Sequence, residues 1–96
     1  MNDFDRLFQK LRNLALSGSA NTKCKDLTEI LNDLGFQIRD GKNAGHKVAI
    51  HPAIPFSESV NYNCGHNQGT SVRPFYIKHL YKFVKLHEDA IKEYLQ

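Results

Sequence analysis

Residues 36–52, FQIRDGKNAGHKVAIHP, contain two short runs in which apolar and polar side chains alternate. A period of two is typical of a β-strand with one buried face. The runs cover 36–40 and 46–51, and the segment between them, 41–45, has a glycine at each end and favours a turn. Pro52 ends the second run, because proline has no backbone N–H for a strand ladder. The stretch therefore predicts an antiparallel hairpin.

The sequence on both sides of this hairpin has the period of a helix instead. Apolar residues recur every three or four positions in the segments 3–16, 22–34 and 75–95. Gly35 is the expected end of the second helix, and Pro74 is well placed to begin the last one. The residues around His87 leave two alternatives open, one long helix or two shorter ones.

Residues 59–63 alternate weakly, which predicts a third strand. The predicted order is helix, helix, three-stranded antiparallel meander and helix, which is an α+β fold. We expect the helices to cover one face of the sheet and to leave the other face free. Because the chain has 96 residues, we expect a single domain, 1–96.

Composition narrows the class of protein. Hydrophobic residues make up 41% and charged residues 24%, which is ordinary for a folded soluble domain, and no apolar run approaches the ~18–20 residues that span a bilayer. The N-terminus lacks a basic region followed by an apolar one, so we expect no secretory signal. Cys24 and Cys64 are too few for a disulfide scaffold, which indicates a reducing, cytoplasmic compartment.

Basic residues are concentrated in the middle of the chain. Residues 39–87 hold seven Lys and Arg against two acidic residues, a net charge of +5, whereas the rest of the chain carries −2. All five histidines also lie in this stretch. The asymmetry indicates a polyanion or an acidic partner, although a solvated surface that is locally basic explains it as well.

Histidine is the clearest chemical signal. The chain has no glycine-rich phosphate loop, so we expect no nucleotide cofactor, and Cys64-Gly65-His66 lacks the spacing of a structural zinc site, so we expect no metal. RNA cleavage needs a base for the ribose 2′-hydroxyl and cations for the phosphorane, and histidine suits proton transfer near neutral pH. His46 is the candidate base, with His51 and His66 as candidates for a second proton carrier. The cations that we expect to bind RNA phosphates are Arg39, Lys42, Lys47, Arg73 and Lys78.

The direction of the His46 side chain is open at this stage. Along a regular strand His46, Val48 and Ile50 face one way, and Lys47, Ala49 and His51 face the other. If Val48 and Ile50 belong to the core, His46 leans toward the core side. It stays accessible there only at the mouth of the strand or through a bulge.

Several short motifs occur in an informative order: Leu34-Gly35-Phe36, Gly45-His46 and Ile50-His51-Pro52. They resemble the HicA family of toxins from bacterial toxin–antitoxin systems, in which a helix ends in Gly-Phe and a Gly-Ser-His turn leads to a strand that ends in His-Pro. Asn63-Cys64-Gly65-His66 stands where a second histidine segment falls in that family, and residues 72–84 resemble its terminal helix. Ala44, in place of the usual serine, and Gly65, in place of a proline, depart from the pattern.

The resemblance covers about residues 24–86 and implies the fold of a double-stranded-RNA-binding domain. It divides the chain into an N-terminal helical extension, 1–18, a HicA-like core, 22–86, and a C-terminal helical extension, 87–96. It further implies an endoribonuclease that cuts mRNA with His46 as the catalytic residue. A HicB-like antitoxin is the implied protein partner, bound over the active site.

Two other hypotheses about the function remain. The first is a non-catalytic RNA-binding module of the same fold, which binds RNA with steep salt dependence and does not cleave it. The second is a protein–protein adaptor that uses the apolar face of the N-terminal helix, namely Phe4, Leu7, Phe8 and Leu11. We favour core packing for this face.

Overall fold

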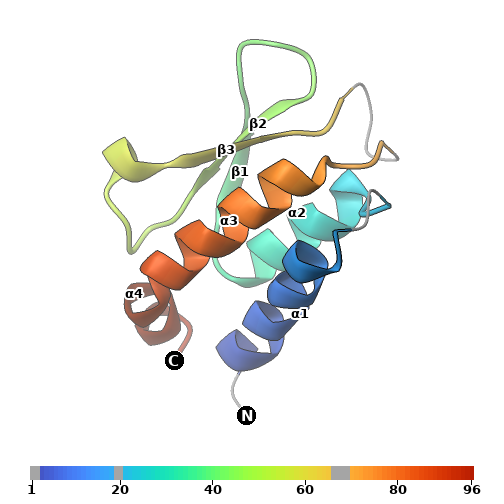
Figure 1. Ribbon diagram of the computed structural model, residues 1–96. Coiled ribbons are helices and arrows are strands. Elements are labelled where there is room, and N and C mark those ends of the chain that lie inside the picture. The colour runs from blue at the N-terminus through green and yellow to red at the C-terminus, as the bar shows by residue number, and fades with distance from the viewer. Residues whose placement is uncertain (1–2, 19–20, 66–69) are drawn as a thin grey trace.

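The computed structural model describes residues 3–18, 21–65 and 70–96, and these form an α+β fold as predicted (Figure 1). The helices are α1 (Asp3–Ser17), α2 (Cys24–Asp33), α3 (Pro74–Leu86) and α4 (Glu88–Tyr94). The strands are β1 (Gln37–Asp40), β2 (His46–Ile50) and β3 (Val60–Asn63), with the short 3-10 helix η1 (Phe56–Glu58) before β3. They pair in an antiparallel sheet of order β1-β2-β3.

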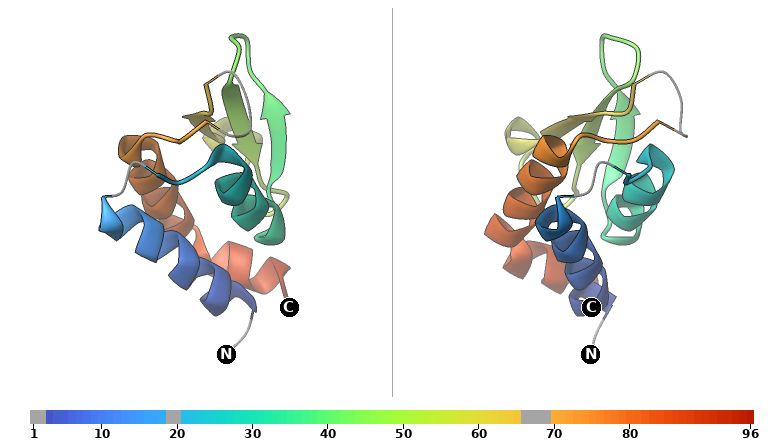
Figure 2. Two further views of the ribbon diagram at one scale, coloured as in Figure 1. Left: turned by 90° about the vertical axis from the view of Figure 1, so that its right-hand side faces the viewer. Right: turned by 45° about the vertical axis from the view of Figure 1, so that its right-hand side comes forward.

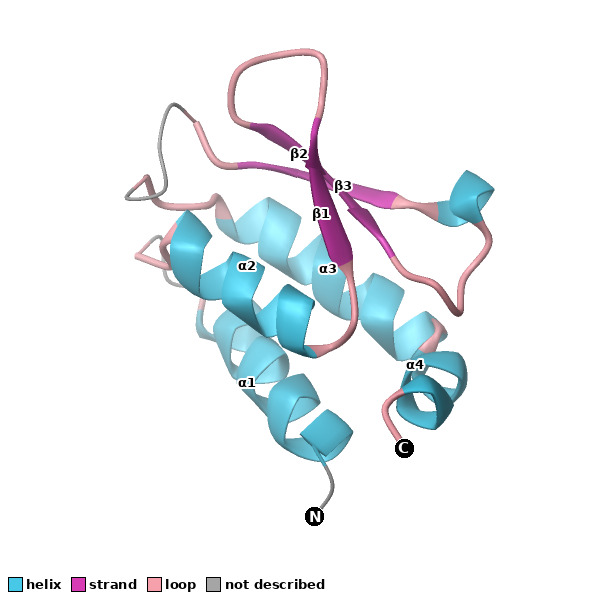
Figure 3. Cartoon of the chain, turned by 180° about the vertical axis from the view of Figure 1, so that it is seen from behind, coloured by secondary structure: helices cyan, strands magenta, loops and turns pink. Residues whose placement is uncertain are grey.

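The helices lie on one side of the sheet. α2 packs against β1 and α3 packs against β3, while α1 contacts both of these helices. Figure 2 and the view from behind in Figure 3 show α1 on the far side of α2 and α3 from the sheet. As the sequence predicted, no helix of the described residues lies over the opposite face of the sheet (Figures 1 and 2).

The apolar face of α1 belongs to the core. Phe4, Leu7, Leu11 and Ala15 are all buried in the same cluster as the inner residues of the sheet. Phe8 is partly buried and stacks between Phe4 and a tyrosine of α3, with ring centroids 5.3 Å apart on each side. The apolar face of α1 therefore packs in the core and is not free to bind a partner. The hypothesis of a protein–protein adaptor, which depended on this face being exposed, loses its support.

Both ends of α2 follow from local backbone chemistry. At its C-terminus Gly35 adopts a φ of +101°, and its N–H and that of Phe36 donate to carbonyls of the last turn at 3.0 Å. At its N-terminus the helix begins at Cys24, whose N–H donates to the carbonyl of Thr70 at 3.0 Å. The helix starts two residues later than predicted, because Lys23 forms an isolated β-bridge with Ser71.

The predicted segment 75–95 forms two helices. The backbone leaves the helical region at His87, where φ is −106° and ψ is 22°. The break allows α4 to turn, which buries Ile91 and brings the ring of Tyr94 to 4.9 Å from that of His51. The C-terminal helix is thus part of the packed domain.

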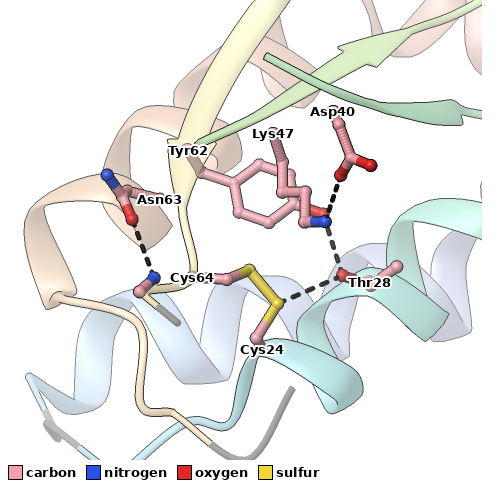
Figure 4. A network of polar contacts seen from close by, with 8 residues as sticks. Cys24, Thr28, Asp40, Lys47, Tyr62, Asn63 and Cys64 are labelled. Atoms are coloured by element: carbon pink, nitrogen blue, oxygen red, sulfur yellow. Dashed lines mark hydrogen bonds and ion pairs between the residues drawn. A yellow bond between two sulfur atoms is a disulfide. The ribbon is translucent and has the colours of Figure 1, made fainter. Parts of the chain in front are cut away.

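Cys24 and Cys64 are joined by a disulfide, a pairing that we did not expect from two cysteines (Figure 4). Their Cα atoms are 5.3 Å apart, and the bond connects the first residue of α2 to the residue after β3. Both side chains are buried. The bond closes a sequence separation of 40 residues, which removes chain entropy from the unfolded state.

We predict that this disulfide contributes substantially to stability. A separation of 40 residues corresponds to about 4 kcal/mol in the chain-entropy model, so reduction lowers the free energy of unfolding by about 3–4 kcal/mol. Urea denaturation with and without dithiothreitol measures the difference. The double variant Cys24→Ser/Cys64→Ser is the control, because its stability does not respond to the reductant. Equal stability of the wild-type protein in both buffers contradicts the prediction.

Candidate functional site

The strand register shows which side chains lie on the open face of the sheet. Val60 and Tyr62 are buried beneath the helices, and their cross-strand partners on β2 are Ala49 and Lys47. Directly opposed residues point to the same face, and neighbours along a strand point to opposite faces. His46 therefore points away from the helices. Val48 and Ile50, which point the same way as His46, are only partly buried and do not belong to the core. The side chain of His46 is therefore not directed toward the core.

His46 shares the open face with several polar side chains. Its cross-strand partner is Asn63, and the next pair on this face is Val48 with Asn61. On the other side of β2, Val48 is paired with Arg39, whose side chain is exposed. The open face thus presents an imidazole, a guanidinium and amide groups around a partly exposed valine.

The turn between β1 and β2 holds His46 at the mouth of its strand. The N–H of Gly41 donates to the carbonyl of His46 at 2.7 Å, and the N–H of His46 donates to the carbonyl of Asn43 at 3.1 Å. The imidazole lies so close to Gly41 that a Cβ at this position would overlap Nδ1, Cγ and Cε1 of the ring. Gly41 therefore provides the space that the His46 ring occupies.

A second glycine turn meets this one from the end of β3. The carbonyl of Gly45 accepts a hydrogen bond from the N–H of Cys64 at 2.7 Å. Gly45 has a φ of +82°, and a Cβ on it would overlap the backbone of Gly65. The structure thereby brings the glycines of the two Gly-His dipeptides, Gly45 and Gly65, together. His66, the second of the two histidines, lies outside the described residues.

A pocket of about 390 Å³ opens beside this junction, at the edge of β3. It is lined by Asn63, Gly65, Thr70, Ser71, Arg73 and Tyr76. Arg73 is exposed and immediately precedes α3, and the Oδ1 atom of Asn63 accepts a hydrogen bond from the N–H of Gly65 at 2.8 Å. Asn63 belongs both to the pocket and to the cross-strand pair with His46, so the pocket adjoins the open face.

The predicted phosphate ligands divide into three groups. Arg39 lies on the open face, and Lys42 is exposed in the turn beside Gly41. Lys47 points to the helix side, where its ammonium pairs with the carboxylate of Asp40 (Figure 4). Because of this ion pair and its direction, we do not include Lys47 in the candidate site.

The remaining two cations lie on the side of α3. Arg73 lines the pocket next to Asn63. Lys78 is exposed on α3 and shares a shallow hollow with Phe75, His79 and Lys82. Lys78 is thus displaced from His46 along the surface, and no motif in the sequence predicted the aromatic residues that accompany it. Asn63 and Tyr76 were missed for a different reason: Asn63 becomes a neighbour of His46 only through strand pairing, and Tyr76 reaches the pocket only because α3 packs against β3.

His51 lies in the core, in contrast to His46. Its ring is 3% exposed and lies between those of Phe36 and Tyr94, at 4.9 Å from each. The N–H of Ala53 donates to Nδ1 at 3.0 Å, so the proton is on Nε2, which donates to the carbonyl of Leu34 at 2.9 Å. Both ring nitrogens are occupied within the fold, and this placement does not suit a proton carrier for a ligand.

Burial also changes the proton affinity of this ring. Desolvation lowers the pKa of His51 below its usual value, and the charge of nearby His87 acts in the same direction. The hydrogen bond to the carbonyl of Leu34 opposes these two effects. We therefore assign His51 a structural role as a neutral imidazole that joins the end of β2 to the end of α2.

Two kinds of feature are absent from the described residues. No three His, Cys, Asp or Glu side chains within 3–18, 21–65 and 70–96 lie together as a metal site. No helix in this part of the chain has the length and apolar character needed to cross a bilayer. No protein-family model, curated protein or solved structure matches the chain.

We predict that Gly41→Ala displaces the His46 ring without unfolding the protein. The φ of Gly41 lies outside the left-handed region, so alanine is compatible with the backbone and the free energy of unfolding changes by less than about 1 kcal/mol. The displaced ring reacts faster with diethyl pyrocarbonate, which mass spectrometry measures at His46. Asn43→Ala, in the same exposed turn, is the matched control and leaves the reaction rate unchanged. An unchanged rate in Gly41→Ala argues against the packing of the ring on Gly41.

We predict that His51 makes the stability depend on pH. Near pH 7 and above, the imidazole is neutral in both the folded and the unfolded chain. As the pH falls through 6.5, the usual pKa of histidine, the unfolded chain takes up a proton that the buried ring excludes. The free energy of unfolding then decreases, by at most about 1.4 kcal/mol per pH unit from this residue.

Urea titrations of the wild-type protein and of His51→Gln between pH 5 and pH 7.5 measure this contribution. The difference between the two slopes belongs to His51, because the other histidines are present in both proteins. Parallel slopes would show that the buried ring does not resist protonation.

Proposed function

We propose that the chain is a small endoribonuclease that cleaves mRNA by histidine acid–base catalysis, with His46 as the general base. The observation that carries this proposal is the position of His46, on the uncovered face of the sheet and packed against Gly41. Arg39 on the same face and Arg73 in the adjoining pocket supply positive charge on either side of it. The motifs that resemble the HicA toxins support the same reading.

In the proposed reaction the neutral imidazole of His46 takes the proton from a ribose 2′-hydroxyl. The 2′-oxygen forms a bond to the adjacent phosphorus, and the bond from phosphorus to the 5′-oxygen breaks. The products are a 2′,3′-cyclic phosphate and a 5′-hydroxyl, whose proton comes from solvent. The guanidinium of Arg39 stabilises the negative charge that develops on the phosphorane oxygens.

The partner that fits this surface is an acidic protein that covers it. A toxin of this kind is held inactive by an antitoxin, and we propose a HicB-like protein bound over the open face of the sheet. Arg39 is exposed on this face and Lys42 in the adjoining turn, and the chain has a net charge of +3, so an inhibitor with negative charge at its interface gains association rate. The Cys24–Cys64 disulfide removes the cysteines as an argument for a reducing compartment, so the proposed cytoplasmic location depends on the mRNA substrate alone.

One observation favours a second function, a non-catalytic RNA-binding module. Lys47, a predicted phosphate ligand, is withdrawn to the helix side by Asp40, so Arg39 and Lys42 are the basic residues of β1, β2 and their turn that stay exposed. Binding needs only the distributed charge of the surface, whereas cleavage needs stabilisation at one phosphate. Both functions therefore include RNA binding, and only the endoribonuclease forms cleaved RNA products.

We predict that His46→Ala abolishes cleavage and preserves the fold. Incubation of the protein with end-labelled RNA in the presence of EDTA gives fragments that end in a cyclic phosphate. Loss of the general base slows their formation by about 100-fold or more. His87→Gln, at the far end of α3 from the pocket, is the control and cleaves at the wild-type rate. Circular dichroism verifies that both variants are folded.

Two outcomes would change the assignment. Cleavage by folded His46→Ala at the wild-type rate removes His46 from the mechanism. Intact RNA with an excess of wild-type protein, together with salt-dependent binding, establishes the RNA-binding module instead.

A further inference from the structure

The exposed side of α3 combines two aromatic rings with two ammonium groups. Phe75 is 70% exposed in the first turn of the helix, although most large apolar side chains of the chain are in the core. The ring of His79, one turn later, is within 6° of parallel to it, with centroids 6.5 Å apart. These rings and the side chains of Lys78 and Lys82 line a hollow of about 170 Å³.

The charge of this helix also points to a polyanion. The sequence of α3, PFYIKHLYKFVKL, contains three lysines and no acidic residue. Lys78 and Lys82 are separated by one helical turn, and like charges at this spacing repel each other. A ligand that carries phosphates relieves this repulsion, which no carboxylate of the helix itself can do.

We propose that Phe75 and His79 form a platform on which a base of single-stranded RNA stacks, with its flanking phosphates bound by Lys78 and Lys82. This inference deepens the proposed function, because it identifies the class of substrate as unpaired RNA. Every base has a π-face, and stacking on aromatic side chains together with cations along the backbone is the usual basis of single-strand binding.

The platform is continuous with the candidate catalytic site. Tyr76 contacts Phe75 edge-on, with ring centroids 5.3 Å apart, and it lines the pocket that also contains Arg73 and Asn63. Asn63 in turn is the cross-strand partner of His46. An RNA strand can therefore follow aromatic and cationic groups from α3, across the pocket, to the mouth of β2.

Single-stranded RNA fits this surface better than duplex RNA or an acidic protein. In a duplex the faces of the bases are already stacked on one another, so Phe75 and His79 would remain unused. An acidic protein would pair with Lys78 and Lys82 but would have no need of a pair of parallel rings. The two alternatives give different results in the binding experiment.

The experiment measures binding of a fluorescent, single-stranded 2′-O-methyl oligonucleotide by anisotropy. This probe has no free 2′-hydroxyl, so it cannot be cleaved, and the result does not depend on whether the protein is a nuclease. We predict that Phe75→Ala raises the Kd by about five-fold or more, the effect of losing one stacked base. Phe75→Tyr retains the ring and the affinity. Phe56→Ala is the matched control, because Phe56 is 69% exposed on η1, at the opposite end of β3, and its loss leaves the Kd unchanged.

An abasic oligonucleotide of the same length separates stacking from charge. It binds the wild-type protein and Phe75→Ala with the same Kd, since it has no base to stack. Lys78→Ala/Lys82→Ala reduces the slope of log K against log salt by about 1.4, at about 0.7 for each phosphate contact on a single strand. Lys10→Ala/Lys25→Ala, on α1 and α2, leaves this slope unchanged.

Three results would overturn the inference. The first is an unchanged Kd of Phe75→Ala for the oligonucleotide with bases. The second is an equal loss of affinity for the abasic probe, which would show that the ring does not stack on a base. The third is tighter binding of an RNA duplex than of the single strand. Failure of His46→Ala to abolish cleavage would affect the proposed mechanism alone, because this binding does not involve the 2′-hydroxyl.

Discussion

The pairing of β2 with β3 is the interaction on which the other features of the molecule depend. It sets Ala49 opposite Val60 and Lys47 opposite Tyr62, and so directs one set of side chains toward α2 and α3. The hydroxyl of Tyr62 is also hydrogen-bonded to that of Thr28 on α2, at 2.8 Å. A shift of β3 by one residue would expose the tyrosine, and a shift of β2 by one residue would direct His46 against the helices. The register that buries the tyrosine therefore also keeps the imidazole on the open face.

His46 and His51 show how strongly this register separates two residues of one type. They are five positions apart on or next to the same strand, an odd number that places them on opposite faces. His51 is enclosed by two aromatic rings and donates to a backbone carbonyl, so its hydrogen-bonding groups serve the fold. The ring of His46 rests on Gly41, a glycine of the turn, and is directed to the uncovered face. One imidazole is thus part of the packed fold, and the other lies on the uncovered face, where we propose that it acts as the general base.

The corner of the molecule near His46 is held by several links between distant segments. The disulfide joins the start of α2 to the residue after β3, Lys23 bridges to Ser71, and the backbones of Gly45 and Gly65 meet. These links use the backbone or buried atoms, whereas the lysines of α3 are exposed on long, flexible side chains. In the RNA-binding function that we propose, the exposed cations would provide affinity and the linked backbone segments would provide position.

The sequence was sufficient to predict the type and order of the elements, the end of α2 at Gly35 and the start of α3 at Pro74. These features depend on residues within one or two turns of one another, and their periodicity and backbone preferences can be read directly. The set of side chains on the open face, the pairing of Cys24 with Cys64, the burial of His51 and the direction of Lys47 required the tertiary structure. Each of these depends on contacts between segments far apart in the chain or on the choice between two faces of a strand. The alternation of apolar and polar side chains along a strand is the same whichever of its two faces is buried. Only the packing of the helices decides which face that is.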